Sequence, residues 1–319
     1  MKTFYQIHGS NGGTFIFSAA SRGDWRKSLE FYRGVSFPAK CKKLLLFLAY
    51  PLLKRKANFD GAEFRFEKLE PSCSAMISPT RDKVIIHHHG AGYEKLAFGK
   101  SSDGVRGELA VYRLLLEKQP QSFAFSEVEE KESSPGQCRF FMKYAGTVFS
   151  EKVPELQDLL GALKEFFLLP GEKTMEWKAL WNSLPDDLQK YVSPEEFTGT
   201  TPVGLVHRDF KPWNVKSGEK SLFFDFESAS FTGCPLEDFF NYTVDPMLRT
   251  TAPATVWEVV QQQFLLAEKL LDMMQIPQSA LLRLWKWYLL ERVWFWRNQE
   301  QMDIANDFLR LYKISNDGK

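Results

Sequence analysis

Two carboxylates, a lysine and a carboxamide lie close together in one part of this sequence. They belong to two neighbouring runs, Val206-His207-Arg208-Asp209-Phe210-Lys211-Pro212-Trp213-Asn214-Val215 and Phe224-Asp225-Phe226-Glu227. Phosphoryl transfer from ATP needs a carboxylate that orients the acceptor hydroxyl and oxygen ligands that hold Mg²⁺ on the phosphates. The two runs supply both sets of groups, so their spacing indicates a kinase.

Each side chain of this set has an expected role. Asp209 is the candidate base, which takes the proton of the hydroxyl as the bond to phosphorus forms. Asn214 offers a neutral oxygen to Mg²⁺, and Asp225 offers a charged one. Lys211 lies between the base and the first metal ligand, where its charge could stabilise the transferred phosphoryl oxygens. A single aspartate would more often be a cap or a turn residue, but the whole combination favours catalysis.

Short apolar runs before these residues predict the strands that position them. Residues 203–206 lead into the loop that carries Asp209, and residues 221–224 lead into Asp225. Such strands would hold the two carboxylates on facing turns.

A strand, a turn and a second strand are predicted between residues 83 and 98. Gly90 and Gly92 lie in the turn, where small residues let backbone N–H groups approach phosphate oxygens. Lys95 on the second strand would direct its ammonium group toward the same phosphates. Since most Gly-x-Gly hairpins bind nothing, this turn counts only together with the downstream motif.

Three consecutive histidines, His87, His88 and His89, end the first of these strands. Adjacent residues of a strand point to opposite faces of the sheet, so the three imidazoles cannot easily converge on one ion. We expect ordinary strand-end histidines here rather than a zinc site.

A helix is predicted over residues 104–118, because apolar residues recur there at helical spacing. Glu108 falls in the first turn of this predicted helix. Its carboxylate could complement the helix dipole at the surface, or it could pair with Lys95 and hold that lysine on the nucleotide. The downstream catalytic motif favours the pair.

Residues 137–146 are typical of a strand that enters a glycine turn. A connection between two lobes at this point could receive the adenine ring on its backbone groups. Met142 and Tyr144 are therefore candidate nucleotide-binding residues, although their side chains carry little information.

Helical patterns dominate the rest of the chain. Helices are predicted over residues 154–167, 173–183 and 185–191, with proline and glycine breaks between them. Further on, a stripe of apolar residues at helical spacing is more typical of core than of a ligand cage. Its members are Leu282, Trp285, Leu289, Val293 and Trp296.

These patterns predict an α+β fold with two lobes. Residues 1–146 would form a smaller N-terminal lobe with an antiparallel sheet that binds the nucleotide, and residues 1–70 of it would be an extension. Residues 147–319 would form a larger, mostly helical lobe that carries the catalytic residues and binds the acceptor. In the extension, strands are predicted at residues 5–7, 14–18 and 59–68.

The composition fits a compact globular protein. With 319 residues, 44% of them hydrophobic, the chain can bury a large core. Its 41 basic and 40 acidic residues nearly balance, so no overall field favours nucleic acid as a partner. Four scattered cysteines fit free thiols, and the N-terminus lacks the apolar core of a signal peptide. We therefore expect a cytoplasmic protein.

A short apolar run with cations on both sides, residues 40–56, allows two interpretations. It is either a buried helix that ends or kinks at Pro51, or a helix that rests on an anionic membrane surface. In the second case the protein would contact the membrane peripherally, and its acceptor could be lipid-linked. No apolar run reaches the roughly 20 residues that a membrane span requires.

The catalytic stretch also resembles known families. Residues 207–214 resemble the catalytic loop of protein kinases, and residues 225–227 resemble the metal-binding Asp-x-Glu of aminoglycoside phosphotransferases and choline kinases. The short return to Asp238 is similar to the Pro-x-x-Asp-Leu element of these phosphotransferases. The resemblance is strong over residues 204–242 and weaker, though in the same order, over residues 84–146.

This resemblance implies a protein-kinase-like fold in which His207, Glu227 and Asp238 support the catalytic loop, with Asp238 as its brace. Two departures bear on the acceptor. Arg208 stands where small-molecule kinases of this type usually have glycine, and Lys211 is more similar to protein kinases and to some sugar or lipopolysaccharide kinases. No long activation segment follows the metal-binding aspartate, so a platform for peptides is not expected.

The leading hypothesis is an ATP- and Mg²⁺-dependent transfer of the γ-phosphoryl group to a hydroxyl of a small molecule or saccharide. The alternatives are a lipopolysaccharide or lipid-linked sugar kinase at the membrane surface, a kinase-like binding protein without catalysis, and, as a minor case, a protein kinase. The acceptor, the choice between ATP and GTP and the oligomeric state stay open. The sequence also leaves open which of four residues face the acceptor, Asp245, Arg249, Glu291 or Arg292.

Overall fold

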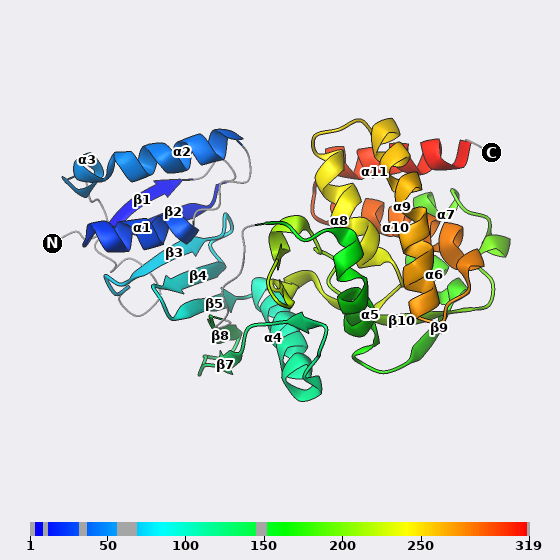
Figure 1. The fold of residues 1–319 in the computed structure, drawn as a ribbon, viewed down its shortest axis with the longest axis horizontal. Helices are drawn as coiled ribbons and strands as arrows, with labels where there is room; N and C mark the ends of the chain where they lie inside the picture. Colours follow the sequence, from blue (N-terminus) through cyan, green and yellow to red (C-terminus); the bar gives the residue numbers. More distant parts are fainter. Residues whose placement is uncertain (1–3, 9–11, 32–36, 56–68, 145–151, 318–319) are drawn as a thin grey trace. The chain divides into compact units, whose positions relative to one another are not determined.

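The computed structural model describes residues 4–8, 12–31, 37–55, 69–144 and 152–317 (Figure 1). The chain divides into two compact units. The first unit contains residues 1–112 and 126–146, and the second contains residues 113–125 and 147–319. Each unit is built around its own sheet or sheets, and together they give the α+β fold that the sequence predicts.

A seven-stranded antiparallel sheet forms the first unit, in the order β1-β2-β3-β4-β5-β8-β7. The strands are β1 (Phe4–His8), β2 (Thr14–Ser18), β3 (Cys73–Ile77), β4 (Lys83–His88), β5 (Gly92–Phe98), β7 (Val128–Glu130) and β8 (Gln137–Lys143). The predicted strands at residues 5–7 and 14–18 are confirmed, and they extend the same sheet that carries the glycine turn. The strand predicted at residues 59–68 lies outside the described residues.

Alternation along β1 and β2 sends apolar side chains to both faces of the sheet. Phe4 and Ile16 pack on one face with residues of β3 and β4. Tyr5 and Phe17 face the other way, against three helices, α1 (Arg22–Phe31), α2 (Phe37–Leu48) and α3 (Tyr50–Arg55). Figure 1 shows these helices over the β1 and β2 edge of the sheet.

The described part of the apolar run, residues 40–55, has both packed and exposed apolar side chains. It forms two helices with a break at Ala49. Pro51 lies in the first turn of α3, where a backbone N–H has no partner within the helix, so the missing N–H of proline costs no hydrogen bond. Leu46, Phe47 and Leu53 pack against the core of the first unit, as the buried-helix interpretation predicts. Other leucines of the same run are exposed.

Helix α4 (Ser101–Lys118) begins three residues earlier than predicted. The backbone N–H and the hydroxyl of Ser102 both donate to Gly99 O, at 3.1 and 2.6 Å, and these bonds start the helix before residue 104. Glu108 is therefore the eighth residue of α4, not a first-turn residue, and its side chain is fully buried. The prediction of a first-turn position is wrong, and so is the surface role that it allowed.

The second unit is mostly helical, as predicted. Its helices are α5 (Leu160–Leu168), α6 (Trp177–Ser183), α7 (Asp186–Gln189), α8 (Glu237–Leu248), α9 (Pro253–Met273), α10 (Leu281–Asn298) and α11 (Met302–Asp317). Short 3-10 turns are η1 (Leu156–Leu159), η2 (Pro194–Glu196), η3 (Pro212–Asn214), η4 (Phe226–Ser228) and η5 (Gln278–Ala280). In the predicted stripe of α10, Trp285, Leu289, Val293 and Trp296 are buried, whereas Leu282 is half-exposed.

Two small sheets carry the segments around the predicted catalytic residues. One has the order β13-β10-β9, from β13 (Ser230–Gly233), β10 (Thr200–Val206) and β9 (Lys173–Glu176). The other has the order β11-β12-β6, from β11 (Val215–Lys216), β12 (Ser221–Phe223) and β6 (Phe123–Ala124). Because β6 pairs with β12 in parallel, residues 113–125 belong to this unit.

The helix predicted over residues 173–183 is only half right. Residues Lys173–Glu176 form strand β9, which pairs antiparallel with β10 in the register Thr200↔Glu176, and α6 starts at Trp177. Pairing with a neighbouring strand has overridden the local pattern. No helix among the described residues is long and apolar enough to cross a membrane.

Candidate active site

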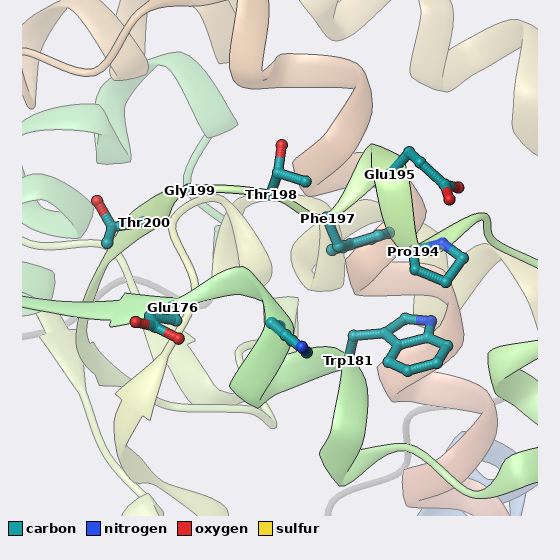
Figure 2. A pocket seen from close by; sticks show the side chains of 9 residues that line it. Glu176, Trp181, Pro194, Glu195, Phe197, Thr198, Gly199 and Thr200 are labelled. Atoms are coloured by element: carbon teal, nitrogen blue, oxygen red, sulfur yellow. The ribbon is translucent and has the colours of Figure 1, made fainter.

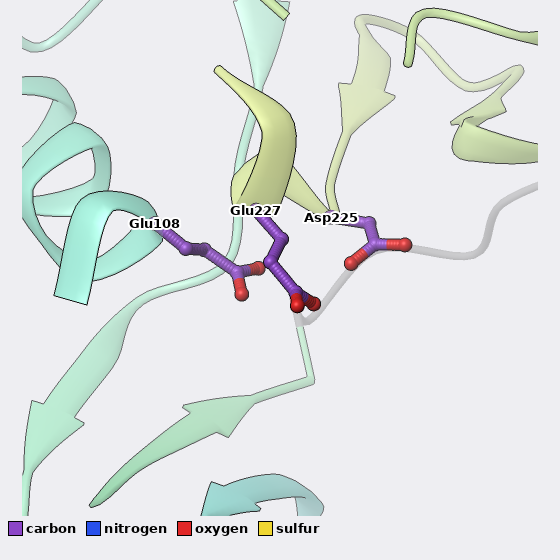
Figure 3. A group of neighbouring side chains, drawn as sticks. All are labelled: Glu108, Asp225 and Glu227. Carbon is purple, nitrogen blue, oxygen red and sulfur yellow. The ribbon is translucent and has the colours of Figure 1, made fainter. Parts of the chain in front are cut away.

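The two small sheets bring the predicted metal ligands to one end of a hairpin. Strand β11 pairs antiparallel with β12, with Val215 opposite Phe223. Asn214 stands directly before this pair, and Asp225 follows it by two residues. Figure 3 shows the Asp225 and Glu227 carboxylates on the segment after β12. Both predicted ligands therefore come from the same end of this hairpin.

Asn214 holds the candidate base directly. Its Nδ2 donates to Asp209 O at 2.9 Å and to Asp209 Oδ2 at 2.8 Å. The Asn214 backbone N–H donates to Lys211 O at 2.8 Å, which closes the turn η3. Because Nδ2 makes both side-chain bonds, the amide turns its Oδ1 away from Asp209, and this oxygen could coordinate a cation.

Asp238 holds the start of the predicted catalytic loop by hydrogen bonds. Its carboxylate accepts the backbone N–H of His207 at 2.7 Å and that of Arg208 at 2.9 Å. Burial raises the pKa of the Asp238 carboxyl, and the hydrogen bonds from the backbone N–H groups of His207 and Arg208 oppose that rise. Arg208 adopts a left-handed φ of 60°, and Asn241 Nδ2 donates to its carbonyl at 2.7 Å. These bonds hold the loop in a backbone conformation that arginine rarely adopts.

His207 connects the predicted catalytic loop to the segment directly before Asp225. The buried imidazole donates from Nε2 to Phe224 O at 3.0 Å. Asp225 itself has a left-handed φ of 70°, which turns the chain directly after this bond. The positions of Asp209 and Asp225 are thus coupled through one histidine.

Lys211 is buried and compensated on two sides. Its Nζ lies 2.5 Å from Asp209 Oδ1 and 3.2 Å from Asp245 Oδ1. The same ammonium stands over the rings of Trp213 and Trp296, at 5.7 and 5.2 Å from their centroids. Asp209 is therefore fixed from both sides, by a lysine and by an amide.

Asp245 and Arg292 complete a charged core that the sequence did not place. Asp245 is fully buried, and besides Lys211 it binds Arg249 Nε at 3.1 Å and Arg292 Nη2 at 3.8 Å. Arg292 also donates from Nη1 to the Arg208 carbonyl at 3.0 Å. The spacing along α8 could have indicated Asp245, because it follows Asp238 by two helical turns and so lies on the same face of the helix.

Glu291 is the remaining carboxylate of this core. It is buried and pairs with the Arg208 side chain. The positive charge of Arg208 is thus neutralised by Glu291 of α10. Of the four residues that the sequence left open, three are buried within this network, Asp245, Glu291 and Arg292, and only Arg249 is partly exposed.

In the first unit the predicted pair of Lys95 and Glu108 is present. Lys95 Nζ lies 2.6 Å from Glu108 Oε2, and both side chains are almost completely buried. The turn before Lys95 requires glycine, because a Cβ at Gly92 would stand 2.0 Å from Met142 O and Gly90 has a φ of 85°. The backbone of the Gly90 turn and the Lys95 side chain therefore belong to one hairpin, formed by β4 and β5.

Met142 and Tyr144 lie at the end of β8, beside the glycine turn. Tyr112 donates its hydroxyl to Met142 Sδ at 3.4 Å, and the Tyr144 N–H donates to Ala91 O at 3.1 Å. The Tyr144 N–H is therefore already used within the unit. Its ring packs at 5.6 Å from that of Tyr93.

The three histidines have three separate sets of partners. His87 bonds to the Tyr144 hydroxyl. His88 contacts Cys73 Sγ at 3.4 Å and Glu94 Oε2 at 3.0 Å. His89 contacts Ser28 and Asp24, each at 3.3 Å. Each imidazole is thus committed to its own neighbours.

A pocket of about 500 Å³ in the second unit contains none of the predicted residues. Figure 2 shows its lining, which includes Glu176, Trp181, Glu195 and Phe197. The pocket reaches Thr200 at the start of β10, whereas the catalytic loop follows the other end of that strand. It is therefore separate from the site around Asp209.

Comparisons with known proteins give structural likenesses only. No protein-family model matches this sequence, and no curated protein gives a significant match. A gentamicin complex of APH(2″)-IIa is 15% identical, with 72% of this chain and 87% of that chain covered and a TM-score of 0.43. The GDP complex of wild-type aminoglycoside 2′-phosphotransferase-IIIa is 12% identical, with 74% and 90% covered and a TM-score of 0.44.

Choline kinase LicA from Streptococcus pneumoniae is 13% identical, with 75% of this chain and 83% of that chain covered and a TM-score of 0.40. These solved structures come from the families that the catalytic stretch resembles. All three TM-scores are below 0.5.

Proposed function

We propose that this protein is an ATP- and Mg²⁺-dependent phosphotransferase that moves the γ-phosphoryl group to a hydroxyl of a small molecule or saccharide. One observation carries the proposal: the Asp209 carboxylate is held by Lys211 on one oxygen and by Asn214 on the other. A carboxylate fixed in this way keeps one orientation toward an incoming hydroxyl. Such positioning is the main contribution that a protein makes to phosphoryl transfer.

Asp209 orients the acceptor hydroxyl and takes its proton as the new oxygen–phosphorus bond forms and the bond to the β-phosphate oxygen of ATP breaks. ADP leaves with the electron pair of the broken bond. Lys211 stabilises the negative charge that spreads over the transferred phosphoryl oxygens. The second partner of Lys211, Asp245, restricts the movement of its ammonium group.

The donor set fits Mg²⁺, since Asn214 supplies a neutral oxygen and Asp225 a carboxylate from the same end of one hairpin. When bound, the ion neutralises phosphate charge and fixes the phosphates in place. Lys95, which Glu108 holds at 2.6 Å, would bind phosphate oxygens of the nucleotide, and the turn at Gly90 would approach them with backbone N–H groups.

A small acceptor is favoured by the short path from Asp225 to α8. Only η4 and β13 lie between that aspartate and the start of α8 at Glu237. A peptide substrate would need a docking segment that this path cannot supply. A lipid-linked hydroxyl stays a second candidate, because leucines of α2 and α3 are exposed.

The test is ADP release by the purified chain with ATP, Mg²⁺ and a panel of sugars, amino-alcohols and aminoglycosides. Asp209→Ala should lower the acceptor-dependent rate by about a thousandfold or more, because base and orientation are lost together. Asp303→Ala, which removes an exposed carboxylate at the start of α11, should keep full activity. Equal activity of wild type and Asp209→Ala would show that the base is wrongly assigned.

A further inference from the structure

Four exposed leucines form one surface on α2 and α3, which we call the leucine face. Its members are Leu44, Leu45, Leu48 and Leu52, with 59%, 66%, 64% and 66% of their surface exposed. Leu44 and Leu48 are four residues apart and Leu45 and Leu48 three apart, which places them on one side of α2, and Leu52 follows on α3. The other side of these helices packs against the core through Leu46.

Exposed large apolar residues elsewhere in the described chain stand apart in sequence. Leu265, Leu282 and Met302 are examples, and each belongs to a different helix. Single apolar residues at a surface are ordinary, but a contiguous exposed patch marks a binding surface or an aggregation hazard. The leucine face is such a patch.

Positive charge surrounds the leucine face in the sequence. Between residues 31 and 59 there is no Asp or Glu, whereas seven cations fall there: Arg33, Lys40, Lys42, Lys43, Lys54, Arg55 and Lys56. The whole chain has a net charge of only +1, so the remainder is net acidic. The side chain of Lys42 is exposed and that of Lys43 partly exposed, next to Leu44.

We propose that the leucine face docks on the anionic surface of a membrane, with α2 and α3 lying in the plane of the interface. Leucines enter the boundary between headgroups and acyl chains, and neighbouring lysines attract anionic headgroups. A second copy of this chain is a poorer occupant, because it would bring two strongly cationic segments together. Docking needs no nucleotide, so it stands or fails separately from the proposed function.

Cys41 supplies a local probe. It is exposed, whereas Cys73, Cys138 and Cys234 are buried, so a thiol-reactive fluorophore should label it selectively. It precedes Leu45 by four residues and so lies on the same side of α2. On vesicles of phosphatidylcholine with phosphatidylglycerol, the emission maximum of the label should shift to shorter wavelengths. On vesicles of pure phosphatidylcholine the emission maximum should shift much less. The control label is Gln261→Cys in a Cys41→Ser background, on an exposed part of α9, and it should not respond.

Cosedimentation of the unlabelled full chain with the same vesicles measures affinity. Leu45→Ser/Leu48→Ser/Leu52→Ser should weaken binding by about a hundredfold or more, because the inserted apolar surface is lost. Lys42→Glu/Lys43→Glu should weaken it by about tenfold or more, and about 0.5 M salt should weaken wild-type binding similarly. Leu265→Ser/Leu282→Ser and Lys100→Glu/Lys220→Glu are the matched controls and should bind normally.

All of these variants change exposed or partly exposed side chains, so unaltered circular dichroism and melting temperature are expected. The proposal is overturned if the wild-type chain does not bind anionic vesicles, or if the leucine variant binds as well as wild type. It is equally overturned if the leucine substitutions abolish a dimer, seen by sedimentation, while vesicle binding persists.

Discussion

At the scale of single residues, Asp245 is the least expected part of the site. It is fully buried and contacts Lys211, so we expect it to act through that lysine as a positioning residue. Asp245→Asn keeps the shape of the side chain and removes its charge. Lys211 would then pair with Asp209 alone and draw the base away from the hydroxyl, so kcat should fall about 10- to 100-fold with little change in the KM for ATP.

Arg249→Gln is the matched control, because Arg249 binds the same carboxylate from a side chain that is 39% exposed. Its effect on kcat should stay within about threefold. Steady-state kinetics of both variants decide the matter. An Asp245→Asn enzyme with normal kcat would mean that the charged core serves stability alone.

The buried pair of Lys95 and Glu108 gives a prediction about stability. Lys95→Met leaves the Glu108 carboxylate buried without that lysine, so the free energy of unfolding should fall by about 3–5 kcal/mol. Glu108→Gln in the same chain should recover a large part of this loss, because the buried negative charge is removed. Chemical denaturation of the two single variants and the double variant measures the coupling. Additive losses would contradict a direct interaction.

The pKa shifts of His87 and His88 predict that stability is greatest at a pH near the ordinary histidine pKa of about 6.5. Burial lowers the pKa of His87 to about 4, so the unfolded chain binds a proton first and stability is lost as the pH falls from about 6.5 to 4. The hydrogen bond to Cys73, followed by that to Glu94, raises the pKa of His88 to about 9. Stability from His88 is complete below about 6.5 and is lost as the pH rises through 9.

Denaturant midpoints at pH 5, 6.5 and 9 in buffers of equal ionic strength test this profile. His88→Asn should flatten only the alkaline side, and His87→Asn only the acidic side. A wild-type midpoint that does not change between pH 6.5 and 9 would contradict the role of His88.

At the scale of elements, β10 and β13 make a close contact directly before the predicted catalytic loop. Gly204 lies opposite Gly233, and a Cβ at Gly233 would stand 2.0 Å from Val206 Cγ2. Since Val206 directly precedes the loop, Gly233→Ala should displace the loop, destabilise the protein by about 1–3 kcal/mol and lower activity. Adding Val206→Ala should restore much of both, because the clash is with that side chain.

Gly204→Ala is the contrasting variant. Its Cβ would stand 2.2 Å from the Phe167 carbonyl oxygen, which is backbone and cannot be trimmed. Thermal melts and ADP release of all three variants report stability and activity together. If Val206→Ala brings no recovery to Gly233→Ala, the contact does not position the loop.

Element by element, the sequence was most informative where chemistry and pattern coincide. The strands on both sides of the Gly90 turn and the strands before Asp209 and Asp225 are confirmed. Two boundaries failed, because they depend on partners far along the chain. Residues 173–176 become a strand only by pairing with β10, and α4 starts early because Ser102 bonds to Gly99.

At the scale of the whole molecule, the long-range contacts of the site were the least predictable. The pairing of Lys211 with Asp245, like the packing of α2 and α3 on β1 and β2, joins residues that are distant in sequence. No local sequence pattern shows which distant residues come into contact. The charge of the chain shows the same limit, since a net charge of +1 conceals a strongly cationic segment.

Nucleotide binding should stabilise the whole chain. A ligand at 100 times its Kd adds about 2.7 kcal/mol to the free energy of unfolding if it binds only the folded state. ATP with Mg²⁺ should therefore raise the melting temperature by several degrees, and EDTA should remove most of the increase. Asp225→Ala should lose the Mg²⁺-dependent part, whereas Asp303→Ala should keep it. An identical shift with and without Mg²⁺ would exclude Asp225 as a metal ligand.

The central claim is that Asp209 promotes transfer of the γ-phosphoryl group to an acceptor hydroxyl. Mass spectrometry of the acceptor after incubation with ATP and Mg²⁺ tests it most directly, because it detects the product rather than the loss of ATP. We predict an acceptor that is heavier by one phosphoryl group with wild type and Asp303→Ala, and an unmodified acceptor with Asp209→Ala. Phosphorylated acceptor formed equally well by Asp209→Ala, or ADP release without any modified acceptor, would contradict the claim.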